Sequence, residues 1–212
     1  FQGKYPVIFL SFKDVKYDSW DKAYSEIYGI MRSEYSKYTK AFNNERINDY
    51  EKQYIASIVN GTASEVELSR SLAVLSAVLY KIYDSAVVIM IDEYDTAIQQ
   101  GFAYGYYDKA ISFIRNLFSG AFKDNPHLAY GFLTGILQVA KESIFSGMNN
   151  LKVNTILDDR FSSYFGFTED EVRDILAYYG RSAKDNEIKE WYDGYHFGNS
   201  EIYNPWSLIN YV

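Results

Sequence analysis

The chain has 212 residues, of which 48% are hydrophobic and 23% charged, and it contains no cysteine. This composition is typical of one globular domain, or of a domain with a small appendage, and it excludes disulfide bonds and thiol chemistry. The net charge of −7 argues against a broad basic face for nucleic-acid phosphates. The apolar runs all fall short of the roughly 20 residues that a membrane span requires. Because the sequence also has no signal-peptide pattern, we expect a cytoplasmic protein without membrane contact.

The N-terminal part of the chain predicts one strand followed by three helices. The segment from Tyr5 to Phe12 is short, apolar and led by Pro6, as in a buried parallel strand. Apolar residues at helical spacing then predict the helices. The third of them begins with a capping box, in which Ser64 is followed by Glu67 three residues later. The expected helices cover residues 19–38, 45–60 and 64–82.

The segment Ala86–Ile91 predicts a strand that is buried on both faces, and it ends abruptly in Asp92, Glu93, Tyr94 and Asp95. Ligands of open α/β sheets sit at this end of the strands. An apolar strand followed by Asp-Glu is the Walker B pattern of P-loop nucleotidases. In that pattern Asp92 holds Mg²⁺ and Glu93 orients the attacking water. The alternative is a strand that runs into a solvated acidic turn.

The C-terminal part predicts further strands and then mainly helices. We expect a glycine- and tyrosine-rich loop over Gln100–Tyr106, and a helix, residues 108–123, that ends before Pro126. A third buried strand over Leu128–Thr134 and a short fourth strand over Val153–Leu157 follow. The aromatic cluster Trp191–Phe197 suggests the core of a small cap, or less often a cover for an adenine base. Capping signals at Thr168 with Glu171, and at Asn204 with Pro205, begin two further helices.

Strands therefore alternate with helices until about residue 157. This order predicts an α/β core over residues 1–157 and a small helical lid over residues 158–212. Within the core, strands that end in Asp92-Glu93 and in Thr134 are expected to bring carboxylates and a hydroxyl to one rim of the sheet. Such a rim is suited to a γ-phosphate, a cation and a positioned water.

Several motifs recur in a fixed order along nearly the whole chain. Each is weak alone, but their joint order is hard to obtain by chance. Together they resemble a family of bacterial predicted ATPases, the AAA-ATPase-like group, whose members often precede a restriction-enzyme-like nuclease domain. The motifs are Gly3-Lys4-Tyr5-Pro6-Val7-Ile8-Phe9-Leu10-Ser11-Phe12, Ile91-Asp92-Glu93-Tyr94-Asp95, Leu133-Thr134-Gly135-Ile136-Leu137, Lys141-Glu142-Ser143-Ile144-Phe145, Phe165-Gly166-Phe167-Thr168, Trp191-Tyr192-Asp193-Gly194-Tyr195 and Tyr203-Asn204-Pro205-Trp206.

The resemblance implies a three-layer P-loop NTPase-like fold, with a parallel sheet and helices on both faces. It also implies ATP and Mg²⁺ as ligands of the full-length protein. Asp92 is then the Walker B carboxylate, Glu93 the catalytic carboxylate and Thr134 the residue that senses the γ-phosphate. Lys141 adds positive charge to the site, although a solvated helix lysine is an equally good interpretation.

Two departures from the family pattern affect this interpretation. The chain contains no G-x-x-x-x-G-K-[ST] loop, which in the family lies upstream of the strand near Tyr5. Gln138 stands where the family often has an arginine, so that a transferring phosphate loses one positive partner. We therefore expect a truncated ATPase domain that lacks its Walker A strand, holds no nucleotide tightly and hydrolyses none alone. A nuclease domain is expected after residue 212, and nucleic acid is contacted only through it.

The expected absence of the Walker A strand also exposes an apolar sheet edge at Leu128–Thr134. We expect this edge to be closed by another chain through self-association, by rearrangement of the chain itself, or by a cleaved N-terminal piece. Two other functions remain open. One is a non-catalytic interaction scaffold with an ATPase-like fold, and the other, less favoured, is a metal-dependent nuclease that uses Asp92, Glu93 and Asp95.

Overall fold

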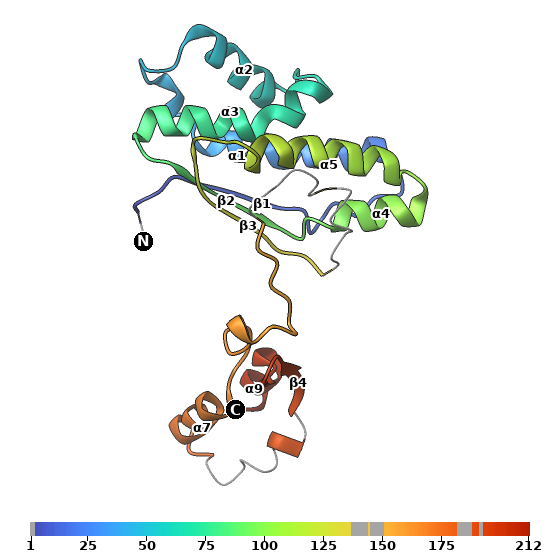
Figure 1. The fold of residues 1–212 in the computed structure, drawn as a ribbon, viewed down its shortest axis with the longest axis vertical. Coiled ribbons are helices and arrows are strands. Elements are labelled where there is room, and N and C mark those ends of the chain that lie inside the picture. The colour runs from blue at the N-terminus through green and yellow to red at the C-terminus, as the bar shows by residue number, and fades with distance from the viewer. Residues whose placement is uncertain (1–2, 137–143, 145–150, 182–187, 191–192) are drawn as a thin grey trace. The chain divides into compact units, whose positions relative to one another are not determined.

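The structure is a computed structural model, and it describes residues 3–136, 144, 151–181, 188–190 and 193–212 (Figure 1). Its internal contacts divide the chain into two compact units, Phe1–Asn150 and Leu151–Val212. These are called the first and second unit below. Among the described residues, the helices are too short or too polar to cross a membrane.

The first unit is built on a parallel sheet of three strands, β1 (Val7–Ser11), β2 (Val87–Asp92) and β3 (Leu128–Leu133). The strand order is β1-β2-β3, so that β2 lies in the centre. Ile91 pairs with Leu10 on one side and with Leu133 on the other, which brings the carboxyl ends of the three strands to one rim. The expected α/β fold, with a parallel sheet flanked by helices, is confirmed.

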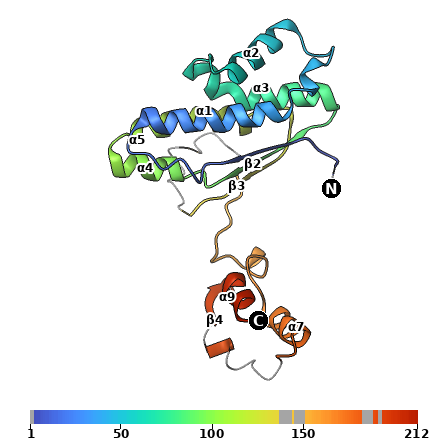
Figure 2. The same ribbon diagram turned by 180° about the vertical axis from the view of Figure 1, so that it is seen from behind.

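The described helices of the first unit lie along one side of this sheet, as both views show (Figures 1 and 2). Capping boxes begin α2 at Asn48 and α3 at Ser64, since in each the side chain three residues later bonds back to the cap. Their apolar faces form one core with the strands. The helices are α1 (Trp20–Lys37), α2 (Asp49–Asn60), α3 (Glu65–Tyr83), α4 (Thr96–Tyr104) and α5 (Tyr107–Phe122).

The two faces of the sheet differ sharply in burial. Side chains alternate between the faces of a strand, and Ile8, Leu10, Ile89 and Ile91 under the helices are at most 1% exposed. The opposite face carries a second apolar set that is 38–52% exposed, which we call the open face: Val7, Phe9, Met90, Tyr130 and Phe132. Strands of this composition are typical of a sheet with both faces covered.

β3 forms one edge of the sheet, and no described residue pairs with its outer side. Because the edge is bare in this single chain, closure of the gap by rearrangement of the chain itself is not supported among the described residues. Closure by another chain or by a cleaved N-terminal piece stays a prediction.

Two expectations about irregular segments were wrong. The expected loop over Gln100–Tyr106 is mostly helical, because α4 runs from Thr96 to Tyr104 and ends at Gly105 in the left-handed conformation. Gly101 lies inside α4, where a Cβ would be 3.1 Å from the Cα of Tyr107, so it allows α4 and α5 to pack closely. The expected strand over Val153–Leu157 is absent, and this segment is irregular.

The second unit contains helices and an antiparallel hairpin that the sequence analysis did not predict. The hairpin joins β4 (Asp193–Phe197) and β5 (Ser200–Tyr203) through a turn at Gly198 and Asn199. The expected helix starts at Thr168 and Asn204 are confirmed for α7 (Glu169–Tyr178) and α9 (Pro205–Tyr211). A small separate core joins these elements: Val172, Leu176, Ile188, Tyr203 and Leu208. Of the aromatic cluster, residues 191 and 192 lie outside the described residues.

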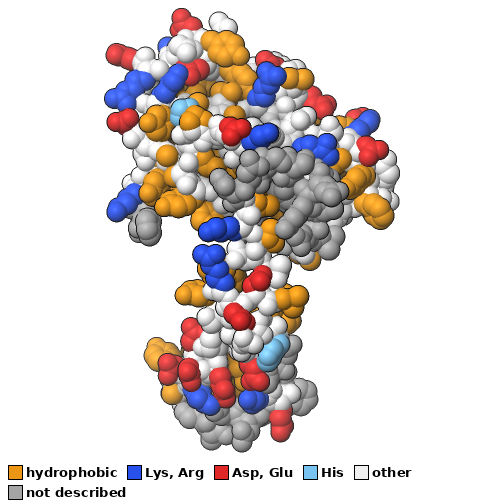
Figure 3. Space-filling model, viewed as in Figure 1, with side chains coloured by type: hydrophobic (Ala, Val, Ile, Leu, Met, Phe, Trp, Pro, Cys, Tyr) orange, Lys and Arg blue, Asp and Glu red, His pale blue; other side chains and the backbone are white. Residues whose placement is uncertain are grey.

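Charged side chains of both signs are interspersed over the visible face of the first unit, and acidic ones are prominent on the second (Figure 3). This distribution accords with the net charge of −7.

Candidate functional site

The candidate site lies where β2 and β3 end. Asp92 is the last residue of β2, and Thr134 follows the last residue of β3. The Thr134 hydroxyl donates a hydrogen bond of 2.5 Å to Oδ1 of Asp92. The structure therefore brings together two of the residues that the sequence analysis selected, although they are far apart in the chain.

Backbone hydrogen bonds fix this arrangement beyond the strands. The N–H of Thr134 donates to the carbonyl of Ile91 at 2.9 Å, and the N–H of Tyr94 donates to the carbonyl of Thr134 at 3.1 Å. The turns after β2 and β3 thus continue the parallel pairing. The backbone of both residues is therefore paired, and Thr134 leads directly into the turn that continues to Ile136.

Glu93 has an unusual backbone conformation, with φ at +51°. A non-glycine residue in the left-handed region costs roughly 1–2 kcal/mol relative to the right-handed one. This left-handed conformation lies in the turn that leads from β2 to α4, and Oε2 of Glu93 accepts a 3.3 Å hydrogen bond from the hydroxyl of Thr96. Strained residues of this kind are often found at active sites, which makes Glu93 a stronger candidate.

The structure adds Ser11, which the sequence analysis did not select. Ser11 ends β1 and pairs with Asp92 in the sheet register, while the next N–H, of Phe12, donates to the carbonyl of Asp92 at 2.9 Å. The Ser11 hydroxyl oxygen is buried and has no hydrogen-bond partner among the described residues. A polar residue at the end of an otherwise apolar strand is a signal in the sequence that could have identified it.

Asp95 is buried, with 1% exposure, and lies at the start of α4. Its Oδ2 accepts hydrogen bonds from Nε2 of Gln99 at 2.7 Å and from the N–H of Ile136 at 3.1 Å. Gln138 and Lys141, the remaining selected residues, lie outside the described residues.

The oxygen atoms at this rim suit a hard cation such as Mg²⁺, because carboxylate and hydroxyl oxygens are its preferred protein ligands. Among the described residues, no group of three or more His, Cys, Asp or Glu side chains forms a complete cage for a metal ion. Mg²⁺ in nucleotide sites usually keeps several waters and takes one or two carboxylates together with substrate phosphates. One carboxylate from Asp92, with hydroxyls beside it, fits that pattern.

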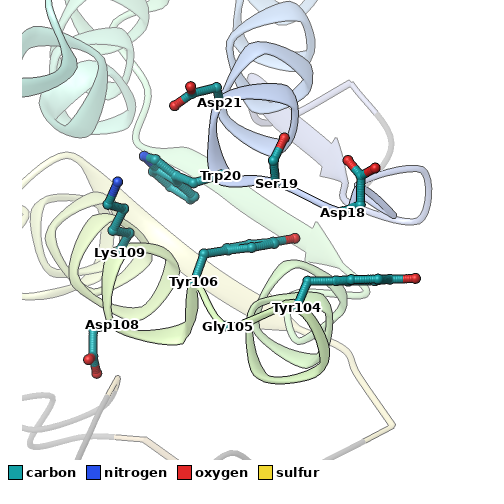
Figure 4. Close-up of a pocket in the computed structure, with 9 residues that line it drawn as sticks. All are labelled: Asp18, Ser19, Trp20, Asp21, Tyr104, Gly105, Tyr106, Asp108 and Lys109. Atoms are coloured by element: carbon teal, nitrogen blue, oxygen red, sulfur yellow. The ribbon is translucent and has the colours of Figure 1, made fainter.

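A hollow of about 470 Å³ elsewhere in the first unit lies between the start of α1 and the turn from α4 to α5 (Figure 4). Its aromatic lining includes Trp20 and Tyr106, which are each 8% exposed and whose ring centroids are 6.2 Å apart. The Tyr106 hydroxyl donates to the carbonyl of Tyr17. These rings are already packed against the core, so we regard the hollow as a surface gap over packed side chains.

Comparisons with known proteins show the family of the chain. A stretch of 124 residues is 33% identical to the "Uncharacterized protein in vnfD 5'region" of Azotobacter chroococcum mcd 1. The match covers 58% of this chain and 24% of the relative, so the chain spans about a quarter of the relative's length. No solved structure matches the chain. The family model described as Predicted AAA-ATPase matches residues 1–145, which include both β2 and β3. The chain therefore belongs to the predicted AAA-ATPase family.

Proposed function

We propose that the first unit carries the Walker B and sensor part of a Mg·ATP site, in a protein that hydrolyses ATP. Membership of the family implies ATP and Mg²⁺ for the full-length protein. The observation that carries the assignment of residues is the hydrogen bond from Thr134 to Asp92 at the shared rim of β2 and β3. Asp92 would hold the Mg²⁺, which would supply positive charge to stabilise the phosphate oxygens during hydrolysis.

In this proposal each residue has a separate role. Asp92 would hold the cation, directly or through water, and we assign the buried hydroxyl of Ser11, which pairs with Asp92 in the sheet register, to a water at the same site. Glu93 accepts a hydrogen bond from the attacking water and orients it. Thr134 donates to Asp92 in this structure, and rotation of its O–H bond alone, without a change of χ1, would let it donate to the γ-phosphate when nucleotide is bound. Lys141 is assigned to the phosphate and Gln138 to the position of the family's arginine.

The glycine-rich phosphate loop is not part of this sequence. Such a loop supplies backbone N–H groups and a lysine to the phosphates, so we expect the chain alone to bind ATP weakly and to hydrolyse none. By resemblance to the family, we further propose that the ATPase cycle regulates a nuclease domain in the longer protein.

A second candidate function is a protein-binding scaffold that keeps the fold without the chemistry. The presence of Gln138, where the family often has an arginine, favours it. It predicts that Asp92 and Glu93 tolerate replacement without any loss of partner binding.

The experiment uses the longer natural protein that includes a glycine-rich loop. Calorimetry with Mg²⁺ and ATP is expected to show binding that Asp92→Asn weakens. Glu93→Gln is expected to keep ATP binding while hydrolysis falls by about 10²–10⁴-fold, the usual contribution of general acid–base catalysis. Glu45→Gln is the matched control, since Glu45 is exposed and lies on a loop before α2. Absence of Mg²⁺-dependent ATP binding in the longer protein would overturn the ATPase proposal and leave the scaffold.

A further inference from the structure

We infer that Asp95 is a positioning residue, whose buried carboxylate holds the turn Thr134–Ile136 in place and so keeps the Thr134 hydroxyl on Asp92. The tie between the turns stands on the contacts alone, and its consequence for a metal ion rests on the proposed function. Asp95 itself does not hydrogen-bond to Asp92 or Thr134 in any described contact.

The carboxylate of Asp95 bonds to the turn after β3 and does not cap the N-terminus of α4. Asp95 is the N-cap residue of α4, yet its side chain makes no capping hydrogen bond there. The backbone carbonyl of Asp95 instead accepts from the N–H groups of Ile98 and Gln99. The side chain is therefore released to accept from the N–H of Ile136, in the turn that follows β3, at 3.1 Å.

The contact is held from the other side by Gln99, one helical turn further along α4. Its Nε2 donates to the same oxygen, Oδ2, at 2.7 Å. Asp95 is 1% exposed, so water competes little for that oxygen. One carboxylate oxygen thus joins the start of α4 to the turn after β3.

Gly135 explains how the two turns approach so closely. A Cβ at this position would lie 2.6 Å from Oδ1 of Asp95 and 2.8 Å from Cε1 of Tyr94, distances that real Cβ atoms essentially never show. The φ angle of Gly135 is not positive, so the constraint is space and not backbone conformation. Gly135 is exposed to solvent, yet the close atoms of Asp95 and Tyr94 leave no room for a side chain at this position.

The consequence concerns Thr134, which lies directly before Gly135. Its carbonyl accepts from the N–H of Tyr94, and its hydroxyl donates to Asp92. If Asp95 released Ile136, the hydrogen bonds on the strand side would be the only ones that hold the turn among the described residues, and the Thr134 side chain could change rotamer more easily. Asp95 therefore sets the direction of a hydroxyl that it does not touch.

The first test uses NMR on this chain, with Asp95→Ala and Asp95→Asn. Asp95→Ala is expected to speed hydrogen exchange of the Ile136 amide by about tenfold or more and to change the Thr134 χ1 couplings, while amides in α3 are unaffected. Asp95→Asn keeps an acceptor oxygen for Ile136 and Gln99 and is expected to restore most of the protection. Asp14→Ala, at an exposed turn, is the control. Unchanged exchange and couplings in Asp95→Ala would overturn the inference.

A second variant keeps the test valid if Asp95→Ala folds poorly. Gly135→Ala should loosen the same turn from the opposite side, and its effect should shrink when Asp95 is already Ala, because Oδ1 is then absent. Gly29→Ala is the matched control, since a Cβ on Gly29 in α1 would meet nothing within 4 Å. If the effects of Gly135→Ala and Asp95→Ala on the turn were strictly additive, the proposed coupling between Gly135 and Asp95 would be contradicted.

The functional consequence is measured in the longer protein with Mn²⁺ and ATP as the probe. Asp95→Ala is expected to weaken Mn²⁺·ATP binding by about tenfold, and Asp95→Asn to recover it. Unaltered binding in Asp95→Ala, together with faster Ile136 exchange, would reduce Asp95 to a purely structural role. If the wild type binds no Mn²⁺·ATP, the proposed function fails, and the Ile136 and Thr134 measurements still decide the inference.

Discussion

Glu34 in α1 reaches the outer edge of β1, where its Oε1 accepts a 3.2 Å hydrogen bond from the backbone N–H of Phe9. The hydroxyl of Tyr38 donates to the carbonyl of Val7 on the same edge. The second oxygen of Glu34 pairs with Lys37, and the Glu34 side chain is 1% exposed. Side chains from α1 and from its C-cap residue therefore occupy hydrogen-bonding groups of β1 that another strand would need, so a further strand cannot pair with this edge.

Removing this block should cost stability. Glu34→Ala leaves the N–H of Phe9 and the ammonium of Lys37 without their acceptor, so the free energy of unfolding should fall by about 1.5–3 kcal/mol. Glu34→Gln keeps an acceptor for Phe9 and should cost less. Urea unfolding followed by circular dichroism measures both, with Glu45→Ala as an exposed control. Equal losses for Ala and Gln at position 34 would show that the contact to Phe9 contributes nothing.

The part of the chain that the structure describes gives the opposite edge no comparable protection, and we propose that the chain self-associates there. The outer side of β3 is unpaired among the described residues, and Tyr130 and Phe132 extend the open face to it. Sedimentation velocity should show mass increasing with concentration, and Phe132→Lys should shift the protein toward the monomer. Phe102→Lys, at an 81% exposed position on α4, is the control. A wild type that stays monomeric at every concentration would refute this proposal.

The conformation of Glu93 predicts an unusual order of stabilities. Glycine adopts positive φ freely, so Glu93→Gly should leave the free energy of unfolding unchanged or raise it by up to about 1 kcal/mol. Valine is β-branched and strongly disfavoured at φ +51°, so Glu93→Val should lower that free energy by about 1–2 kcal/mol. Thermal unfolding of the two variants beside the wild type tests the order. A more stable Val variant would mean that the turn readily takes another conformation.

Buried tyrosines predict unfolding in alkali. Burial, with a smaller effect of the Glu65 charge, raises the pKa of Tyr24 to about 12, and burial raises the pKa of Tyr35 and of Tyr38 well above 10. The protonated phenol is the form that the fold favours, so this stability is fully present below pH 10 and is lost as the pH rises from 10 to about 12.

This pH dependence is measurable for Tyr24. Tyrosinate absorbance and circular dichroism should change together above pH 10 in the wild type, and Tyr24→Phe should reduce the loss of stability between pH 10 and 12. Tyr50→Phe, at a 73% exposed position on α2, is the matched control. Ionisation of all tyrosines without any loss of structure would contradict the prediction.

Local signals in the sequence were sufficient for many of the elements. Ser64 with Glu67 and Thr168 with Glu171 form the expected capping boxes, because both partners of each box lie within one turn of helix. The apolar run before Asp92 became the central strand, and the strand ending at Leu133 became its neighbour. The meeting of Asp92 and Thr134 followed from parallel pairing alone.

The features that the sequence analysis missed depend on contacts between distant segments. Gly101 weakens a helix by its own propensity, yet α4 forms because the glycine allows close packing on Tyr107. The approach of Gly135 to Asp95 is equally invisible in a single stretch of sequence. Gly198 and Asn199 are typical turn residues and could have predicted the hairpin of β4 and β5. The aromatic residues before them were interpreted as a cap core instead.

The open face has a practical consequence for handling this protein. In the native state this face exposes apolar side chains to water, those of Val7, Phe9, Met90, Tyr130 and Phe132. Dyes whose fluorescence increases on apolar surfaces should therefore bind to the folded protein before it unfolds. A thermal unfolding curve followed by dye fluorescence would then start from a high signal and give a wrong midpoint. Circular dichroism of the backbone is therefore the better measure of the stability of this chain.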